Sequence, residues 1–310
     1  MSADTSVQGG LLQRLSDELA GAVEQTGRST VRVNARRRLP ATGIAWSANL
    51  VVTANHVVER DEEITITAPD GTEYPAKLVG RDPGSDLAAL QVDGGNLTAA
   101  TRAPVEEVRV GGLVLALGRA GALSATIGVV SAIEGPWESG RGRRFNRLVA
   151  SDAPMFPGFS GGPLVDASGR VIGLLSSHLG RGQTLAIPTG DVEKIVGSLQ
   201  THGRVKRGYL GIGAQPVALP AALREAQGLE QEHGLLLVTV EDGGPAAQGG
   251  LMIGDIIVAI AGQPVQSLDS LRQSLGPDSV GSGIPLRVLR GGQTQDVTVT
   301  VGEQPTRSES

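Results

Sequence analysis

The chain has 310 residues, a formal net charge of −5 at pH 7, no cysteine and 45 glycines. This length predicts about two domains, each able to bury a core of its own. The mildly negative charge gives no reason to expect a nucleic-acid partner. The lack of cysteine excludes disulfide bonds and thiolate chemistry. Many glycines and few charged residues favour short strands joined by turns.

The N-terminal segment predicts an amphipathic helix. Residues 1–10 are polar and are expected to be disordered, and then leucines and a valine recur at helical spacing: Leu11, Leu12, Leu15, Leu19 and Val23. Their apolar face is expected to pack on the protein itself or on a partner subunit rather than on a membrane, because basic residues are scarce. With neither a signal-like start nor a run of ~20 apolar residues, the sequence predicts a soluble, cytoplasmic protein, or a periplasmic or other extracytoplasmic one if the N-terminus is truncated.

Neither the clusters of charged residues nor the spacing of possible metal ligands indicates a cofactor. Arg36, Arg37 and Arg38 stand together, a pattern more typical of a solvated loop than of a nucleic-acid site. No group of His, Cys or Asp has the spacing of metal ligands. We therefore expect no metal, no cofactor and no nucleic-acid partner.

The most informative motif is a glycine-rich turn at residues 158–164. Ser160 lies between glycines, and apolar strand residues follow. Glycines at such a turn permit unusual backbone angles and the close approach of another chain. The turn can therefore present a hydroxyl and backbone N–H groups to one carbonyl, as acyl transfer requires. Taken alone, a Gly-Ser-Gly-Gly run is more often a plain turn.

A nucleophilic serine needs a base, and the chain has only four histidines. His56 directly follows a short β-branched strand. His178 also follows a strand and is the weaker base candidate, or a residue that lines the cleft. His202 and His233 lie in polar, glycine-flanked stretches that indicate solvated loops.

A third residue should orient the base. Asp86 begins an apolar strand after His56, whereas its rivals Asp82 and Asp93 flank turns. The resulting order of His, Asp and Ser along the chain is that of the chymotrypsin-type triad.

The segments around these residues resemble the catalytic blocks of the HtrA (DegP/DegS-like) serine proteases, at residues 53–58, 86–90 and 158–164. Residues 128–131 and 185–188 resemble further strands of that family, and residues 151–154 resemble its approach to the nucleophile. The resemblance covers residues 19–303. It implies a mostly β fold, in which a chymotrypsin-like double β-barrel protease domain is followed by an α+β PDZ domain.

The resemblance also implies roles for single residues. Ser160 would be the nucleophile, His56 the general base and Asp86 the residue that orients it. The backbone N–H groups of Gly158 and Ser160 would form the oxyanion hole. The chain departs from the family at Phe159, where an Asn is usual. Its ring either holds the turn in a resting state that substrate or peptide opens, or simply packs against a neighbouring loop.

The specificity pocket is expected to suit small or medium aliphatic side chains. Pro154 occupies the place where trypsin-like pockets carry an acidic residue, and its neighbours are apolar. We take Met155, Phe156 and Ser177 as candidate pocket residues.

The domains are expected at 1–29 (N-terminal tail and helix), 30–199 (protease), 200–206 (linker), 207–303 (PDZ) and 304–310 (disordered tail). A helix is expected from Asp191 and another at 268–275. By resemblance, the carboxylate-binding loop of the PDZ domain is Tyr209, Leu210, Gly211 and Ile212. There an extended peptide would add as a strand.

The resemblance implies an ATP-independent serine endopeptidase that cleaves unfolded or misfolded proteins in quality control and stress response. The PDZ domain would bind C-terminal or hydrophobic peptides for recruitment or regulation. The alternative is a latent or inactive PDZ-containing protein that binds peptides or acts as a chaperone. Family members are commonly trimers held by N-terminal aromatic residues, so a homotrimer is implied, although no aromatic residue precedes Trp46 here.

Overall fold

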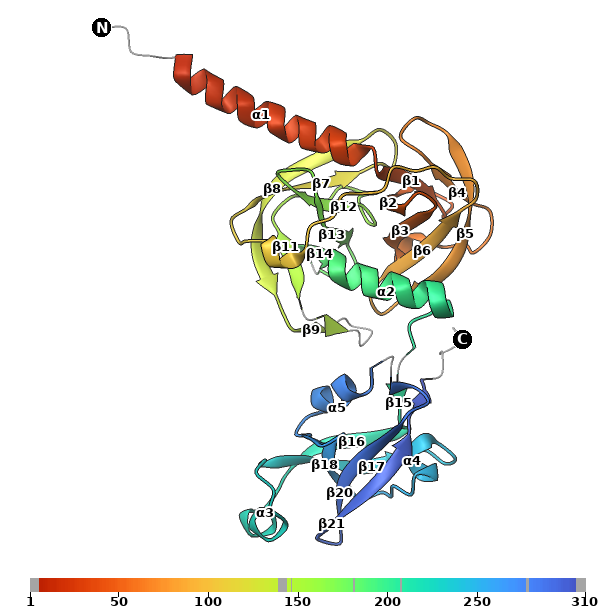
Figure 1. Ribbon diagram of the computed structural model, residues 1–310, viewed down its shortest axis with the longest axis vertical. Coiled ribbons are helices and arrows are strands. Elements are labelled where there is room, and N and C mark those ends of the chain that lie inside the picture. Colours follow the sequence, from red (N-terminus) through yellow and green to blue (C-terminus); the bar gives the residue numbers. More distant parts are fainter. Residues whose placement is uncertain are drawn as a thin grey trace, which may run out of the picture. The chain divides into compact units, whose positions relative to one another are not determined.

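The computed structural model describes residues 6–138, 144–145, 147–180, 182–206, 208–276 and 279–304. The chain divides into two compact units, residues 1–205 and 206–310 (Figure 1). Apart from Gln304, the expected tail at 304–310 lies outside the described residues.

The first unit contains two closed antiparallel barrels, each of six strands. The first barrel runs in the order β1-β2-β3-β6-β5-β4, with β1 Thr30–Asn34, β2 Ala41–Ser47, β3 Leu50–Ala54, β4 Ile64–Thr67, β5 Glu73–Asp82 and β6 Leu87–Val92. The second runs in the order β11-β14-β13-β12-β7-β8, with β7 Leu113–Gly118, β8 Ser124–Glu134, β11 Leu148–Ser151, β12 Pro163–Asp166, β13 Val171–Ser176 and β14 Thr184–Pro188. The predicted double barrel is confirmed.

Three short elements complete the barrel unit. They are the 3₁₀ helices η1 Asn55–Val57 and η2 Val105–Glu107, and a hairpin of β9 Trp137–Glu138 with β10 Arg144–Phe145. The first of them matters most for function, because it carries His56 directly after β3.

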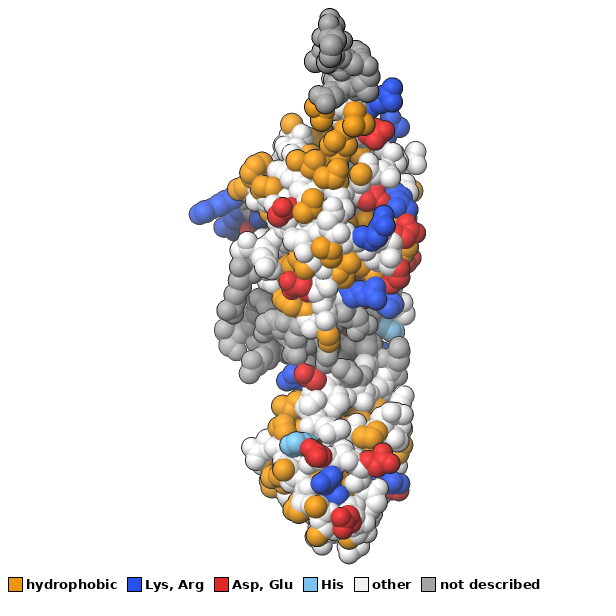
Figure 2. Space-filling view, turned by 90° about the vertical axis from the view of Figure 1, so that its left-hand side faces the viewer, with side chains coloured by type: hydrophobic (Ala, Val, Ile, Leu, Met, Phe, Trp, Pro, Cys, Tyr) orange, Lys and Arg blue, Asp and Glu red, His pale blue; other side chains and the backbone are white. Residues whose placement is uncertain are grey.

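The N-terminal helix α1 extends over Ser6–Gly27 and so begins earlier than the sequence predicts. Once nucleated, a helix gains one hydrogen bond for each residue it fixes, and polar residues do not stop it. Leu19, Ala22 and Val23 near its end pack on the main core. Leu11, Leu12 and Leu15 near its start stay exposed. Figure 2 shows hydrophobic side chains gathered along this part of the helix, below the grey N-terminal residues.

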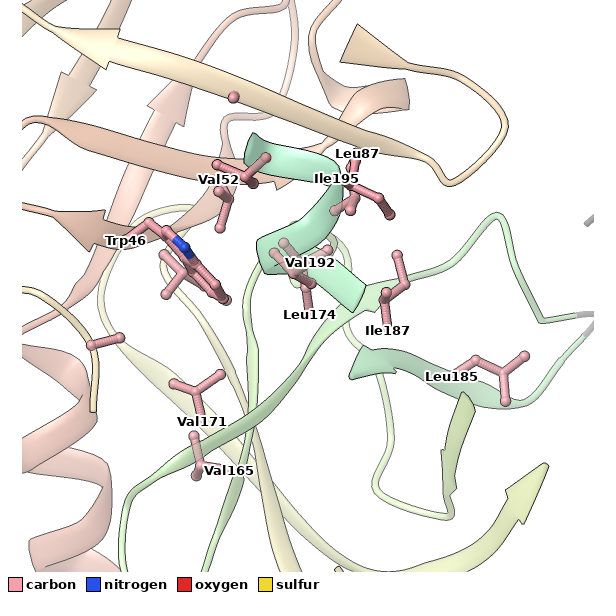
Figure 3. Packing of buried hydrophobic residues seen from close by; sticks show 14 of the residues in the cluster. Trp46, Val52, Leu87, Val165, Val171, Leu174, Leu185, Ile187, Val192 and Ile195 are labelled. Atoms are coloured by element: carbon pink, nitrogen blue, oxygen red, sulfur yellow. The ribbon is translucent and has the colours of Figure 1, made fainter. Parts of the chain in front are cut away.

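Helix α2, Thr189–His202, packs against both barrels through one shared core. Figure 3 shows its Val192 and Ile195 among side chains of the first and second barrels, which are Trp46, Val52, Leu87, Leu174 and Ile187. The helix ends where Gly203 adopts a left-handed φ of 70°. The first three residues of the expected linker, 200–202, are therefore helical.

The second unit is a sheet with the strand order β16-β17-β18-β20-β21, flanked by short helices. Its strands are β15 Gly208–Tyr209, β16 Ile212–Ala218, β17 His233–Val240, β18 Ile256–Ile260, β19 Gln263–Pro264, β20 Gly283–Arg290, β21 Gln293–Thr300 and β22 Gly302–Glu303. Its helices are α3 Ala221–Gln227, α4 Pro245–Gln248 and α5 Leu268–Ser274. Strand β16 lies at the edge of this sheet, which leaves one side of it unpaired.

Candidate active site

Strand pairing brings His56 and Asp86 together. Strands β3 and β6 are antiparallel partners, and Ala54 pairs with Leu87 at the end of the ladder. His56 follows β3 and Asp86 precedes β6, so both lie at the same end of adjacent strands. The two residues are joined by a 2.7 Å contact from His56 Nδ1 to Asp86 Oδ2, and the backbone N–H of His56 donates to Asp86 Oδ1 at 2.9 Å.

The carboxylate of Asp86 is buried, and it accepts hydrogen bonds from neighbouring protein donors. Burial by itself would raise the pKa of Asp86, but the His56 ring, the Ser176 hydroxyl and the His56 backbone N–H outweigh it and leave the pKa lowered. The Ser176 hydroxyl donates to Asp86 Oδ2 at 2.5 Å. An ionised Asp86 favours the tautomer with a proton on His56 Nδ1, so that Nε2 can accept one.

The two rival carboxylates have other partners. Asp82 accepts hydrogen bonds from the backbone N–H groups of Gly84 and Ser85, which is a turn role. Asp93 forms an ion pair with Lys77 at 2.9 Å. Of these three candidates, Asp86 is the one that contacts His56.

The hydroxyl that contacts Nε2 of the base is that of Ser177. Its Oγ lies 3.4 Å from His56 Nε2, which completes a His56–Asp86–Ser177 geometry of the triad kind. The Ser160 hydroxyl donates to Ser177 Oγ at 3.0 Å and is therefore connected to the base through Ser177. Sequence reasoning placed Ser177 only in the pocket. The available signal was its position directly after Ser176, at the end of β13.

The Ser160 turn has the backbone form that its glycines predict. Gly158 and Gly161 have φ of 92° and 85°, values that L side chains rarely adopt. Thr42 holds the turn from the first barrel, because its hydroxyl donates to Gly158 O at 2.6 Å and its N–H to Ser160 O at 3.4 Å. Within the described chain, the N–H groups of Gly158 and Ser160 donate to no protein acceptor.

Phe159 anchors this turn in the second barrel. Its ring is buried and fills the space beside Gly118, where an added Cβ would lie 2.2 Å from the ring. The exposed ring of Phe156 meets it edge-on at 5.6 Å. The ring therefore packs within the second barrel, and a gating role for Phe159 stays a prediction.

The triad region lies in a cleft of about 540 Å³ that includes His56, Ser160 and His178. All three pocket candidates line it: Met155, Phe156 and Ser177. Met155 and Ser177 also line a neighbouring cavity of about 720 Å³ in the second barrel. That cavity is not purely apolar, because Glu134 and Asp152 contribute to its wall.

His178 stacks on His56, with ring centroids 3.7 Å apart and planes 17° from parallel. It covers one face of the base and lines the cleft, as one of its two sequence interpretations proposed. Within the described residues, ligand atoms of His56, Asp86 and His178 lie within 4.8 Å of one another. Nearly parallel imidazoles direct their lone pairs side by side, so this orientation does not suit the tetrahedral coordination of one metal ion.

Comparison with known proteins agrees with both units. Residues 41–174 match the family of trypsin-like peptidase domains, and residues 208–301 match the PDZ domain family. The HtrA-type protease AlgW, solved with a tripeptide, is 32% identical with a TM-score of 0.76, covering 93% of this chain and 98% of that chain. The chain belongs to the HtrA family of serine proteases.

Other HtrA relatives show the same pattern. A serine endoprotease from Yersinia pestis is 30% identical with a TM-score of 0.75, over 93% of this chain and 98% of that one. Proteins named as probable periplasmic DegP-like serine endoproteases from Halomonas elongata and Chlamydia trachomatis are 36% and 34% identical, over 87% and 90% of this chain. The chain spans 57% of the length of each of these two.

Membrane-spanning helices are not found in the described part of this HtrA-type chain. Each helix there is too short or too polar to cross a bilayer.

The expected peptide loop of the PDZ unit leads directly into the edge strand β16. Gly211 has φ of 72°, so a β-branched residue there would be strained. The carbonyls of Leu210 and Gly211 accept from Ala246 and Glu241 N–H groups at 2.8 Å. In the described chain, the N–H groups of Leu210 and Gly211 have no protein acceptor, so the loop keeps two donors.

An acidic side chain that sequence reasoning missed lies against this loop. Glu241 accepts a hydrogen bond from the Tyr209 hydroxyl, and that bond is the main reason why the pKa of Tyr209 is raised. A Cβ added to Gly211 would lie 3.1 Å from the Glu241 carboxylate. A peptide carboxylate held by this loop would therefore approach a like charge.

Proposed function

We propose that this HtrA-type chain is an active serine endopeptidase with Ser160 as nucleophile, His56 as general base and Asp86 as the residue that orients it. The observation that carries the proposal is the Ser160 turn, where the hydroxyl stands beside the unpaired N–H groups of Gly158 and Ser160. Preorganised donors of this kind are what the oxyanion of an acyl-transfer intermediate needs.

Ser177 is less suited to be the nucleophile, although its hydroxyl is the one that contacts His56 Nε2. Its own N–H already points to Ser160 Oγ at 3.4 Å. It also directly follows strand β13 and has no glycine on either side, unlike Ser160, which precedes Gly161 and Gly162. A carbonyl attacked by Ser177 would lack the two free backbone N–H donors, those of Gly158 and Ser160, that the Ser160 turn offers.

The proposed chemistry follows from these contacts. Ser160 Oγ attacks the scissile carbonyl carbon, and its proton passes through the Ser177 hydroxyl to His56 Nε2. The oxyanion is held by the N–H groups of Gly158 and Ser160. His56 then protonates the leaving amine, and a water molecule hydrolyses the acyl-enzyme by the same route in reverse. The Asp86 carboxylate stabilises the imidazolium at each stage.

Hydrolysis of casein, an unfolded protein, tests this proposal. The variant Ser160→Ala should abolish turnover while its circular dichroism stays that of the wild type. His56→Ala should lose nearly as much, because triad members act as a unit. Turnover retained in purified Ser160→Ala would contradict the assignment.

As substrates we propose unfolded or misfolded proteins, cut after small or medium aliphatic residues that contact Met155, Phe156 and Ser177.

The second candidate function is a latent, chaperone-like peptide binder. It is favoured by one observation, the hydrogen bond of Ser160 to Ser177 instead of to His56. Suppression of aggregation by a wild-type chain that hydrolyses no protein would decide for the second candidate.

For the PDZ unit we propose peptide binding by strand addition to β16, with the terminal carboxylate held by the loop of residues 209–212. The edge position of β16 and the two unpaired N–H groups of the loop support this. The relative AlgW has been solved with a tripeptide and with a decapeptide.

A homotrimer and a periplasmic location remain proposals. The exposed Leu11, Leu12 and Leu15 on α1 offer an apolar face for a second subunit. Light scattering after gel filtration tests assembly, and an unchanged molecular mass after all three leucines are replaced by Ser would contradict a role for this face.

The curated relatives are named periplasmic. Cell fractionation tests a periplasmic location for this chain, and its recovery together with cytoplasmic marker proteins would contradict that proposal.

A further inference from the structure

The loop between β1 and β2 adjoins the Ser160 turn. An added Cβ on Gly158 would lie 3.4 Å from the Pro40 carbonyl oxygen, and Thr42 bonds to both Gly158 and Ser160. Arg36 and Arg38 of this loop line the same cleft as His56 and Ser160. The sequence pattern alone favoured a solvated basic loop here, but two of its three arginines border the reacting groups.

The two arginines differ in their bonding. Arg36 is occupied with its own loop, since its guanidinium donates to the carbonyls of Leu39 and Pro40. Arg38 is exposed, and no carboxylate of the described chain lies within ion-pair distance of it. Glu59 is the one acidic residue among the described residues that line the cleft. The cleft therefore carries an excess of positive charge at this end.

The arrangement of the cavities indicates which side of a bound substrate this positive charge would face. The cavity of the second barrel and the cleft meet at Met155 and Ser177. If the acyl part of a substrate occupies the barrel cavity, the chain beyond the scissile bond runs past Ser160 toward the β1–β2 loop. The arginines would then meet the leaving-group side of the substrate.

We infer that Arg38, supported by Arg36, selects substrates with an acidic side chain within the first three residues after the scissile bond. A guanidinium pairs with a carboxylate through a planar fork of donors, which favours Asp and Glu over their amides. The inference rests on the proposed endopeptidase function and names a specificity within it. Because Arg38 is exposed, we expect a preference of about threefold to fivefold, the upper part of the range for exposed ion pairs.

Paired internally quenched peptides that differ only by Glu or Gln at one of these three positions test the inference. Wild type at ~50 mM salt should give a Glu/Gln ratio of kcat/KM of about three to five at one position, and the ratio should approach one at ~1 M salt. Arg38→Gln should lose this ratio. Arg37→Gln is the matched control, because it removes the same charge from the same loop but does not line the cleft.

Equal cleavage of the Glu and Gln peptides at all three positions would overturn the inference, as would equal losses in Arg38→Gln and Arg37→Gln. Binding of the same two peptide sequences, labelled with a fluorophore but no quencher, to Ser160→Ala, followed by anisotropy, separates this outcome from failure of the proposed activity. If wild type cleaves neither peptide, the proposed function fails. Tighter binding of the Glu peptide would still support charge selection, and equal affinities would refute it.

Discussion

Asp86 holds His56 by two atoms, one contact to the ring and one to the backbone N–H. Replacing Asp86 by Asn should lower kcat by up to about 10⁴-fold, because the amide favours the wrong imidazole tautomer. The fold should survive, since Asn also tolerates the left-handed φ of 57° found at this position. Casein hydrolysis measures the effect, and a loss below tenfold would contradict the role of Asp86.

The same carboxylate makes the stability of the first unit depend on pH. The pKa of Asp86 in the folded chain lies below the ordinary aspartate value of 3.8, so its contribution to stability is present above that value and is lost as pH falls through the folded pKa. Urea unfolding followed by the two tryptophans, Trp46 and Trp137, should show this loss in wild type below about pH 4. Asp86→Asn should show a smaller loss, and an identical pH profile would count against the assignment.

Sequence order could predict the His56–Asp86 pair, because two buried strands with these residues at their ends have few ways to pair. It could not predict the position of Ser177. Whether its hydroxyl faces His56 depends on where β13 ends and on the side-chain rotamer, neither of which leaves a pattern in the sequence. The same holds for Glu241, which reaches the peptide loop from a turn far along the chain.

At the scale of elements, the Ser160 turn is fixed from both barrels, by Thr42 on one side and by the Phe159 ring on the other. The barrels themselves were predictable because their strands are short, apolar and bounded by turn residues. The packing of the Phe159 ring could not be predicted, because the space for the ring depends on Gly118, which lies in a strand distant in sequence.

Phe159→Ala should lower the free energy of unfolding by about 3–5 kcal/mol, as expected for an aromatic ring lost from a packed core. It should also reduce turnover, because the oxyanion turn loses its anchor. Phe156→Ala is the control, since that ring is exposed and its loss should affect stability far less. Urea denaturation of both variants checks this. Equal stability of Phe159→Ala and wild type would remove the anchoring role.

At the scale of the whole molecule, the chain joins a barrel unit with the proposed reaction site to a sheet unit with the proposed peptide-binding loop. Glu241 next to that loop should weaken binding of a free carboxylate. Glu241→Gln, introduced into the full Ser160→Ala chain, should tighten binding of a peptide with an apolar C-terminal residue by about twofold to fivefold. Calorimetry with the amidated peptide as control measures it. An equal gain for the amidated peptide would show that charge repulsion is not the cause.

The identity of the nucleophile is the central claim, and a fluorophosphonate probe tests it most directly, because only an activated serine reacts. The native chain is labelled, digested and mapped by mass spectrometry. The adduct should lie on Ser160 and be absent from Ser160→Ala, and labelling should slow in Ser177→Ala, because that variant lacks the hydroxyl that carries the proton to His56. An adduct on Ser177, or a native chain that takes up no label, would contradict the account.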